Sequence, residues 1–294
     1  MLKQYCASVL LSFPILASQA KADFLPPNDL HLEDGIIRAS DMTEAEFNAV
    51  IDEVVAVYEP IVNRLHKGKL KVNRLWTNST VNASAMQWFG NWEVNMYGGL
   101  ARRPEITRDG FAIVLCHELG HHLAGYPFSG AWSGNEGQSD YFATQACGRM
   151  LWKNDLEKNA EAREEIEDIP RAACDSVWKD RDDQNLCYRL MLAARSTADL
   201  LSSQERKSLA WDSPDAAVVK STYHGHPRGQ CRLDTYMAGA LCGKEFDAAV
   251  IPGKDLGWQR NSENAERASA KVTCNQFQNY DIGYRPLCWF KPQL

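Results

Sequence analysis

Apolar residues recur every three or four positions over several stretches of the chain, the pattern of helices that bury one face. The first stretch follows a clear start signal, because Thr43 and Glu46 stand three residues apart as in a capping box. Gly68 provides the stop signal. The apolar positions between these signals are Phe47, Val50, Val54, Val57, Ile61 and Leu65. The pattern therefore predicts one long amphipathic helix between Thr43 and Gly68.

Strand-like patterns follow this helix. Residues 70–76, 81–88 and 92–97 each read as a strand, and turn sequences stand at 78–80 and 90–91. We expect these segments to form a small antiparallel sheet.

Helical periodicity returns over most of the second half of the sequence. It predicts helices over 109–124 and 136–152, joined by a loop rich in Gly and Pro, and a helical region from 155 to about 204 that breaks at Pro170. Another helix is predicted over 232–241. The predicted class is α+β, mostly helical, with an extended leader over 23–40, a main domain over 41–245 and a Cys-containing tail over 246–294.

Composition indicates a folded globular protein. Apolar residues make up 45 % of the chain, and nine Trp, ten Tyr and ten Phe can build a core. The net charge of −6 does not suggest a nucleic-acid partner. The oligomeric state stays open.

The N-terminus has the pattern of a signal peptide. Lys3 is followed by a short apolar region at 9–16 and by the small residues Ala20 and Ala22. We predict cleavage after Ala22, so that residues 1–22 are removed and the protein is exported, periplasmic or secreted, with no integral membrane segment in the mature chain. A short membrane anchor is the alternative, although the apolar region is too short to span a bilayer comfortably.

Cysteine usage fits export. Removal of Cys6 with the leader leaves eight Cys, an even number that suggests disulfides. Local pairings are the simplest hypotheses, and Cys116 is interpreted as either buried and free or bonded to another element. The three local pairings are Cys174 with Cys187, Cys231 with Cys242, and Cys274 with Cys288.

Residues 117–121 form a His-Glu-Leu-Gly-His sequence within a predicted helix. Residues four apart lie on one helical face, so His117 and His121 can bind one zinc ion. Glu118 stands about 100° round the helix from His117. From there its carboxylate can take a proton from a water molecule that attacks a carbonyl, without binding the metal itself.

A catalytic zinc ion usually has three protein ligands and one open position. Glu136 begins the next predicted helix, and Asp140 follows one turn later on the same face. We predict that Glu136 is the third ligand and that Asp140 accepts a hydrogen bond from a zinc-binding histidine, most simply His117. The alternative for Glu136 is an ordinary acidic residue in a first helical turn.

Several segments resemble the gluzincin metallopeptidases of the CAAX prenyl endopeptidase family, which has soluble, exported members. Residues 81–85 are similar to the family's Asn-Ala-x-Ala segment, and 92–100 to the strand and Gly-Leu that follow it. The two zinc-motif segments, 116–121 and 136–140, match in order. Late in the chain, His226-Pro227 and Arg232 match a His-Pro with an Arg six positions after the His.

The resemblance implies a zincin-like fold, one Zn²⁺ ion and a peptide or protein substrate. It also implies that His226 and Arg232 face the zinc cleft, where His226 either stabilises an oxyanion or caps the metal. His224 is an alternative for that role, whereas His31, His66 and His122 are interpreted as structural. In gluzincins a strand near the zinc helix binds the substrate backbone, so the segment 92–97 is either that strand or an ordinary interior one.

The predicted activity is therefore that of a zinc endopeptidase with Glu118 as general base. Three alternatives stay open: an envelope binding or chaperone-like protein whose zinc site is closed by His226, a zinc hydrolase of a non-peptide amide, and a disulfide-linked module without metal. Cobalt or manganese could also occupy the same ligand set.

Overall fold

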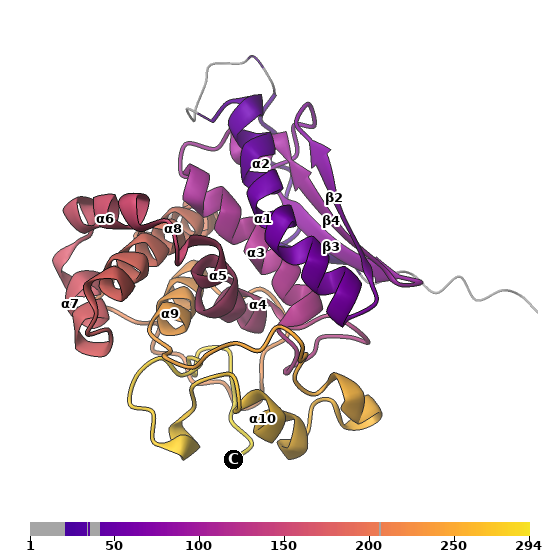
Figure 1. The fold of residues 1–294 in the computed structure, drawn as a ribbon, viewed down its shortest axis with the longest axis vertical. Coiled ribbons are helices and arrows are strands. Elements are labelled where there is room, and N and C mark those ends of the chain that lie inside the picture. Colours follow the sequence, from indigo (N-terminus) through magenta and orange to yellow (C-terminus); the bar gives the residue numbers. More distant parts are fainter. Residues whose placement is uncertain (1–20, 34, 36–41, 206) are drawn as a thin grey trace, which may run out of the picture.

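The computed structural model describes residues 21–33, 35, 42–205 and 207–294. A four-stranded sheet lies on one side of the molecule, α1 and α3 lie beside it, and the other helices lie beyond α3 (Figure 1). The predicted α+β class is confirmed. Most of the predicted signal peptide, and residues 34 and 36–40 of the predicted leader, lie outside the described residues.

The sheet has the order β1-β3-β4-β2, and its strands are β1 (Lys21–Asp23), β2 (Lys69–Leu75), β3 (Ala83–Trp88) and β4 (Asn91–Tyr97). β3 and β4 form a hairpin around Gly90, whose φ of 80° suits glycine. β2 runs parallel to β4, with Leu70 beside Trp92. The prediction of a wholly antiparallel sheet was therefore wrong, because β3 is not placed next to β2 and β4 returns between them, parallel to β2.

One face of the sheet packs against α1 (Glu44–Leu65) and α3 (Arg108–Leu123). The capping box predicted for α1 is confirmed, since Thr43 accepts from the Glu46 N–H at 3.3 Å and donates its own N–H to the Glu46 carboxylate at 2.8 Å. A single helical turn, α2 (Gly98–Ala101), follows β4. Every side chain of α3 from residue 110 to 123 is buried, because the sheet covers one side of this helix and other helices cover the rest.

The predicted helix 136–152 is continuous but not uniform. It consists of α4 (Glu136–Phe142), a π-helical segment η1 (Ala143–Gly148) and α5 (Arg149–Trp152). The helical region that follows contains α6 (Leu156–Glu165), α7 (Asp168–Val177) and α8 (Arg181–Glu205). The break predicted at Pro170 lies just before it, at residues 166–167 between α6 and α7. Pro170 itself lies in the first turn of α7, where a missing N–H costs no helical hydrogen bond. α8 packs on α3, α6 and α9 (Gly229–Ala240).

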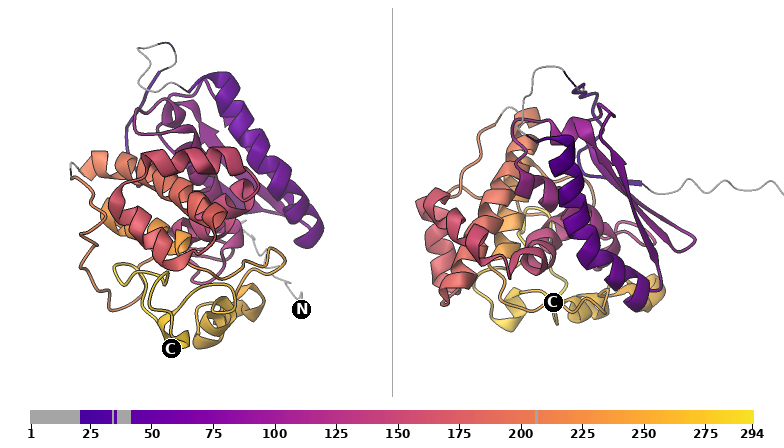
Figure 2. Two further views of the ribbon diagram at one scale, coloured as in Figure 1. Left: turned by 60° about the vertical axis from the view of Figure 1, so that its left-hand side comes forward. Right: turned by 45° about the horizontal axis from the view of Figure 1, so that its top comes forward.

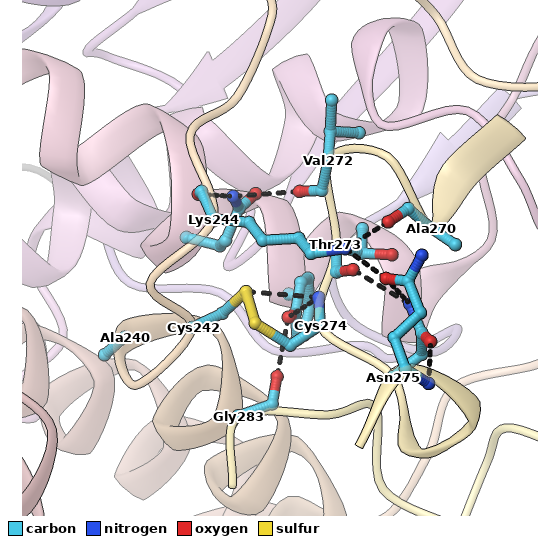
Figure 3. Close-up of a disulfide and its surroundings, with 12 residues drawn as sticks. Ala240, Cys242, Lys244, Ala270, Val272, Thr273, Cys274, Asn275 and Gly283 are labelled. Atoms are coloured by element: carbon cyan, nitrogen blue, oxygen red, sulfur yellow. Dashed lines mark hydrogen bonds between the residues drawn. A yellow bond between two sulfur atoms is a disulfide. The ribbon is translucent and has the colours of Figure 1, made fainter. Parts of the chain in front are cut away.

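The last fifty residues contain short helical turns, η2 (Lys254–Gln259), α10 (Glu263–Ser269) and η3 (Gln276–Gln278). In both views of Figure 2 they lie at one end of the molecule, below the helices. Figure 3 shows how this segment is attached near α9. Cys242 forms a disulfide with Cys274, and Nζ of Lys244 donates a hydrogen bond to the carbonyl oxygen of Ala270. The tail belongs to the folded core, because Trp289 and Arg285 are almost fully buried.

Four disulfides link the described residues, and two of the three predicted pairings were wrong. The observed bonds are Cys116–Cys147, Cys174–Cys187, Cys231–Cys288 and Cys242–Cys274. Only the pairing of Cys174 with Cys187 was predicted correctly. Cys231 lies in α9 and Cys242 just beyond its end. These two residues cannot bond each other, since about ten residues of helix separate their Cα atoms by about 15 Å, against less than about 7 Å in a disulfide.

Candidate metal centre

α3 and α4 bring three potential metal ligands together in the core. His117 and His121 lie one turn apart on α3, and Glu136 begins α4. The Glu136 carboxylate lies 3.3 Å from Nε2 of His117 and 3.5 Å from Nε2 of His121. The three ligand atoms lie within 4.8 Å of one another, and all three residues are buried. This arrangement can hold one metal ion.

The Nδ1 atoms of the two histidines already have hydrogen-bond partners. Nδ1 of His117 lies 2.7 Å from Asp140 Oδ1, and Nδ1 of His121 lies 2.8 Å from the carbonyl oxygen of Gly134. By contrast, both Nε2 atoms and Oε2 of Glu136 are buried without a hydrogen-bond partner in the described structure. A buried polar atom without a partner is energetically costly. In a metal-binding histidine, the ring nitrogen that does not bind the metal usually donates to a carboxylate or a carbonyl oxygen. The residues present therefore fit a divalent cation.

Local sequence explains why α3 and α4 approach so closely. A Cβ atom on Gly120 would lie 2.8 Å from Cα of Ser139, so only glycine fits at this contact. Asn135 caps α4 by accepting from the Gln138 N–H at 2.9 Å. The loop is tied back by a hydrogen bond from Gly134 N–H to the carbonyl of His121. These contacts place the first residue of α4 opposite the two histidines.

Asp140 occupies its predicted position behind His117. Arg232 was expected to face the zinc cleft, and it does not. Arg232 is fully buried on α9 and donates two hydrogen bonds to Asp140, at 2.6 and 2.7 Å. Burial alone would raise the pKa of Asp140, but the charge of Arg232 lowers it below its ordinary value. The guanidinium lies behind the histidine because α9 packs on α4, and it holds Asp140 as an anion.

Glu118 supplies the carboxylate of the His-Glu-Leu-Gly-His sequence. Both of its oxygens are buried without a hydrogen bond in the described structure. Burial raises its pKa well above the ordinary value, and its charge interacts with those of His117 and Glu136. A carboxyl group whose pKa is raised in this way is better suited to take up and return a proton than an ordinary carboxylate.

The imidazoles differ in protonation. Burial lowers the pKa of His121 to about 4, which keeps this ring neutral. Burial alone would also lower the pKa of His117, but the carboxylates of Asp140 and Glu136 raise it to about 9. A cation that binds here therefore competes with a proton on His117.

His226 reaches the cluster from the segment before α9. Its Nε2 lies 3.8 Å from Oε2 of Glu136 and donates to the carbonyl oxygen of Asp23 at 2.7 Å. A cavity of about 310 Å³ opens beside these groups, and His224 and Trp132 also line it. His224 lies in the wall of this cavity, and the structure gives its ring no contact with the three ligands.

The remaining histidines lie outside the ligand cluster. His122 is buried between the rings of Trp92 and Trp132, at centroid distances of 5.1 and 4.8 Å. His66 stacks on Trp92, and His31 lies beside Ser79. The structural interpretation of these three residues agrees with their contacts.

The strand at 92–97, β4, is an interior strand. It is paired with β3 on one side and β2 on the other. Of the two interpretations of this segment, the structure supports the ordinary interior strand, because β4 has no free edge to which a substrate backbone could add. β3 is the strand whose outer edge lies on the side of the metal centre, and of the strands in the described part of the chain only β1 pairs with it there.

Sequence reasoning missed the contribution of residues 23 and 24. The ring of Phe24 packs edge-on against His117 at a centroid distance of 5.2 Å, and its carbonyl accepts from Arg232 at 2.7 Å. No motif marked these residues, because their contacts use the main chain and one apolar ring.

Comparisons of the chain with protein-family models, with curated proteins and with solved structures gave no match. Among the described residues, no helix combines the length and apolar character needed to cross a membrane.

Proposed function

We propose that the protein is an exported, zinc-dependent endopeptidase. The observation that carries this proposal is the combination of three buried ligand atoms without hydrogen-bond partners and the equally unpartnered carboxylate of Glu118 beside them. Nitrogen and carboxylate ligands in this number are typical of catalytic zinc. The four disulfides support passage through an oxidising compartment.

The chain's own residues have distinct roles in this proposal. His117, His121 and Glu136 would hold the metal, which supplies a polarised carbonyl and a more acidic water molecule. Glu118 accepts the proton of the attacking water and passes it to the leaving amine. The Nε2–H group of His226 donates a hydrogen bond to the carbonyl oxygen of the substrate beside the ligands, as it does to the carbonyl oxygen of Asp23 in the structure. This hydrogen bond favours His226 as an oxyanion donor over a fourth ligand, because a ring nitrogen that donates a proton cannot also bind a metal.

An extended peptide is the substrate class that fits the surroundings. The outer edge of β3 lies beside the metal centre, and among the described strands only the three-residue β1 pairs with it. Strand edges bind extended backbone by strand addition, so a peptide that takes the place of β1 would lie next to the ligands. The cavity beside Glu136 provides room for a side chain next to the reacting bond.

The test compares the parent protein with Glu118→Gln, using metal analysis and a peptide library read by mass spectrometry. We expect both proteins to bind one zinc ion and only the parent to cleave peptides. Glu105→Gln is the matched control, because Glu105 pairs with Arg103 and is not part of the cluster. Cleavage by the Glu118→Gln variant at the parent's rate would refute the mechanism.

Assays of the same proteins on envelope amides and a zinc-bound structure separate the alternatives. A parent protein that binds zinc and cleaves an envelope amide but no peptide would be a hydrolase of non-peptide bonds. Zinc bound by four protein ligands, with no hydrolysis of either class, would indicate a binding protein with a closed site.

A further inference from the structure

The turn between β3 and β4 carries the most exposed large apolar side chain of the described residues. Phe89 is 95 % exposed and its neighbour Trp88 is 39 % exposed, and one ring lies edge-on to the other at a centroid distance of 6.0 Å. In Figure 1 and in the right-hand view of Figure 2, this turn projects from the right-hand side of the molecule. Two aromatic rings therefore stand at the end of a protruding hairpin, outside the core.

Local backbone preference does not explain a phenylalanine at this position. β3 ends at Trp88 and β4 begins at Asn91, so Phe89 and Gly90 form a two-residue turn. Both turn residues have a positive φ, 44° for Phe89 and 80° for Gly90. Asn followed by Gly is the pair that such a turn favours, whereas a bulky residue with a positive φ is strained. The strained residue contributes little burial to the fold, which indicates that its ring serves a contact outside the molecule.

One face of the sheet carries a lysine in register with these rings. Lys69 pairs with Asn91, and Asn91 pairs with Trp88, so the three residues form one row across the sheet. Successive side chains of a strand alternate between the two faces of a sheet. Leu70 and Trp92 are buried against the helices, so the row formed by their neighbours points to the face that α1 and α3 leave uncovered.

Two more lysines flank Lys69 along the chain. Lys67, Lys69 and Lys71 are all exposed, and the described ion pairs include none of them. The Lys69 N–H donates to the Gly90 carbonyl oxygen at 2.9 Å, which holds this segment against the turn. Glu93 is the register partner of Lys71, so the four charged residues together carry more positive than negative charge. The exposed rings therefore stand beside a basic surface.

We propose that this docking tip, formed by Trp88, Phe89, Lys67, Lys69 and Lys71, attaches the protein to an anionic lipid bilayer. Aromatic rings prefer the interface between the headgroups and the hydrocarbon of a bilayer, and lysines are attracted to its anionic headgroups. Attachment becomes stronger with both the inserted apolar area and the charge. A protein partner fits the tip less well, because a stable protein interface buries about 800 Å² on each side, and a two-residue turn offers much less.

The test is co-sedimentation of the full chain with large unilamellar vesicles. One kind of vesicle is phosphatidylcholine alone, and the other is a mixture of phosphatidylcholine and phosphatidylglycerol. We expect the protein to bind the mixed vesicles at least about fivefold more tightly than the neutral ones. Added salt should weaken the binding to the mixed vesicles, because it screens the charges of the lysines.

The variant Phe89→Asn separates docking from folding. It should bind the mixed vesicles about tenfold more weakly, because the ring no longer enters the interface. Its Tm should equal or exceed that of the parent, because asparagine suits a positive φ before Gly90, whereas a ring needed for the fold would lower Tm when removed. Ile169→Asn is the matched control, since Ile169 is an exposed apolar residue of α7, on the opposite side of the molecule in Figure 1. Its vesicle binding should equal that of the parent.

A pair of double variants tests the role of charge. Lys69→Gln/Lys71→Gln should weaken binding to the mixed vesicles about 25-fold, or about fivefold for each lysine. Lys153→Gln/Lys158→Gln removes the same charge just before and within α6, on the opposite side of the molecule from the turn. This control should stay within about twofold of the parent.

The proposal does not depend on the proposed function, because none of the docking residues belongs to the ligand cluster. Failure of the parent to bind the mixed vesicles would overturn it, and so would equal binding by the parent and Phe89→Asn. Dimerisation that requires Phe89, without any vesicle binding, would assign the tip to a second copy of the chain and overturn the proposal as well. Peptide cleavage is tested separately by Glu118→Gln and is unaffected by any of these results.

Discussion

Asp140 gives the sharpest test of how the metal centre is built, because one carboxylate serves two buried partners. It accepts two hydrogen bonds from Arg232 and lies 2.7 Å from Nδ1 of His117, and all three side chains are fully buried. Asp140→Asn keeps the size and an acceptor oxygen but removes the charge. The variant therefore separates the electrostatic role of this residue from its shape.

The expected effect has two parts. Arg232 would become a buried cation without its anion, and breaking a buried pair in this way costs about 3–5 kcal/mol of unfolding free energy. His117 would lose the charged partner that orients its ring, which lowers metal affinity by about 10- to 100-fold. The first part is measured by urea unfolding of the metal-free protein, and the second by zinc competition with a chromogenic chelator.

The control is Asp109→Asn. Asp109 pairs with buried Arg189 at 2.6 Å, but Arg189 retains a second carboxylate, Asp155, at 2.9 Å. This control should lower stability less and leave zinc affinity unchanged. In the double variant Asp140→Asn/Arg232→Met, stability should partly return because no charge stays unpaired, whereas zinc affinity should stay low. A single Asp140→Asn protein whose zinc affinity lies within about twofold of the parent would refute the role assigned to this carboxylate.

Other parts of the structure give three further predictions. Metal removal should lower the unfolding free energy by about 2.7 kcal/mol relative to zinc at a hundred times its Kd, seen as a lower Tm in calorimetry. Gly120→Ala places a Cβ 2.8 Å from the Ser139 backbone, so α3 and α4 must separate; about 1–3 kcal/mol of stability should be lost in urea titrations, with weaker zinc binding in the chelator assay. Thr43→Ala removes the cap of α1, which should cost about 1 kcal/mol while zinc affinity stays at the parent value, and an altered affinity would contradict this separation.

The parts of the site that sequence predicted correctly are those that depend on helical geometry alone. Two histidines four residues apart must share a face of α3, and Asp140 must lie one turn beyond Glu136 on α4, whatever the rest of the chain does. That α3 and α4 lie next to each other could be inferred only because a zinc site with two histidines needs a further ligand such as Glu136. Gly120 gives it a steric reason that the sequence alone does not show.

The errors lie where distant segments meet, with one exception. Nothing local shows that β4 returns between β2 and β3, because strand order depends on how each connection crosses the sheet. Pairing Cys231 with Cys242 was a different kind of error, since the helix predicted between them already holds these residues too far apart to bond.

The segment at residues 21–25 shows why the mouth of the site was the least predictable part. Its contacts with His226, Arg232 and β3 are made mainly by main-chain groups, which every residue possesses and which therefore leave no signature in a sequence. The small residue Ala22 satisfies two requirements at once, because it suits a predicted cleavage position and also a strand position opposite Ala85. A sequence pattern that signals removal of a segment says nothing about where that segment lies beforehand. Only the fold shows that the predicted cleavage point borders the metal centre.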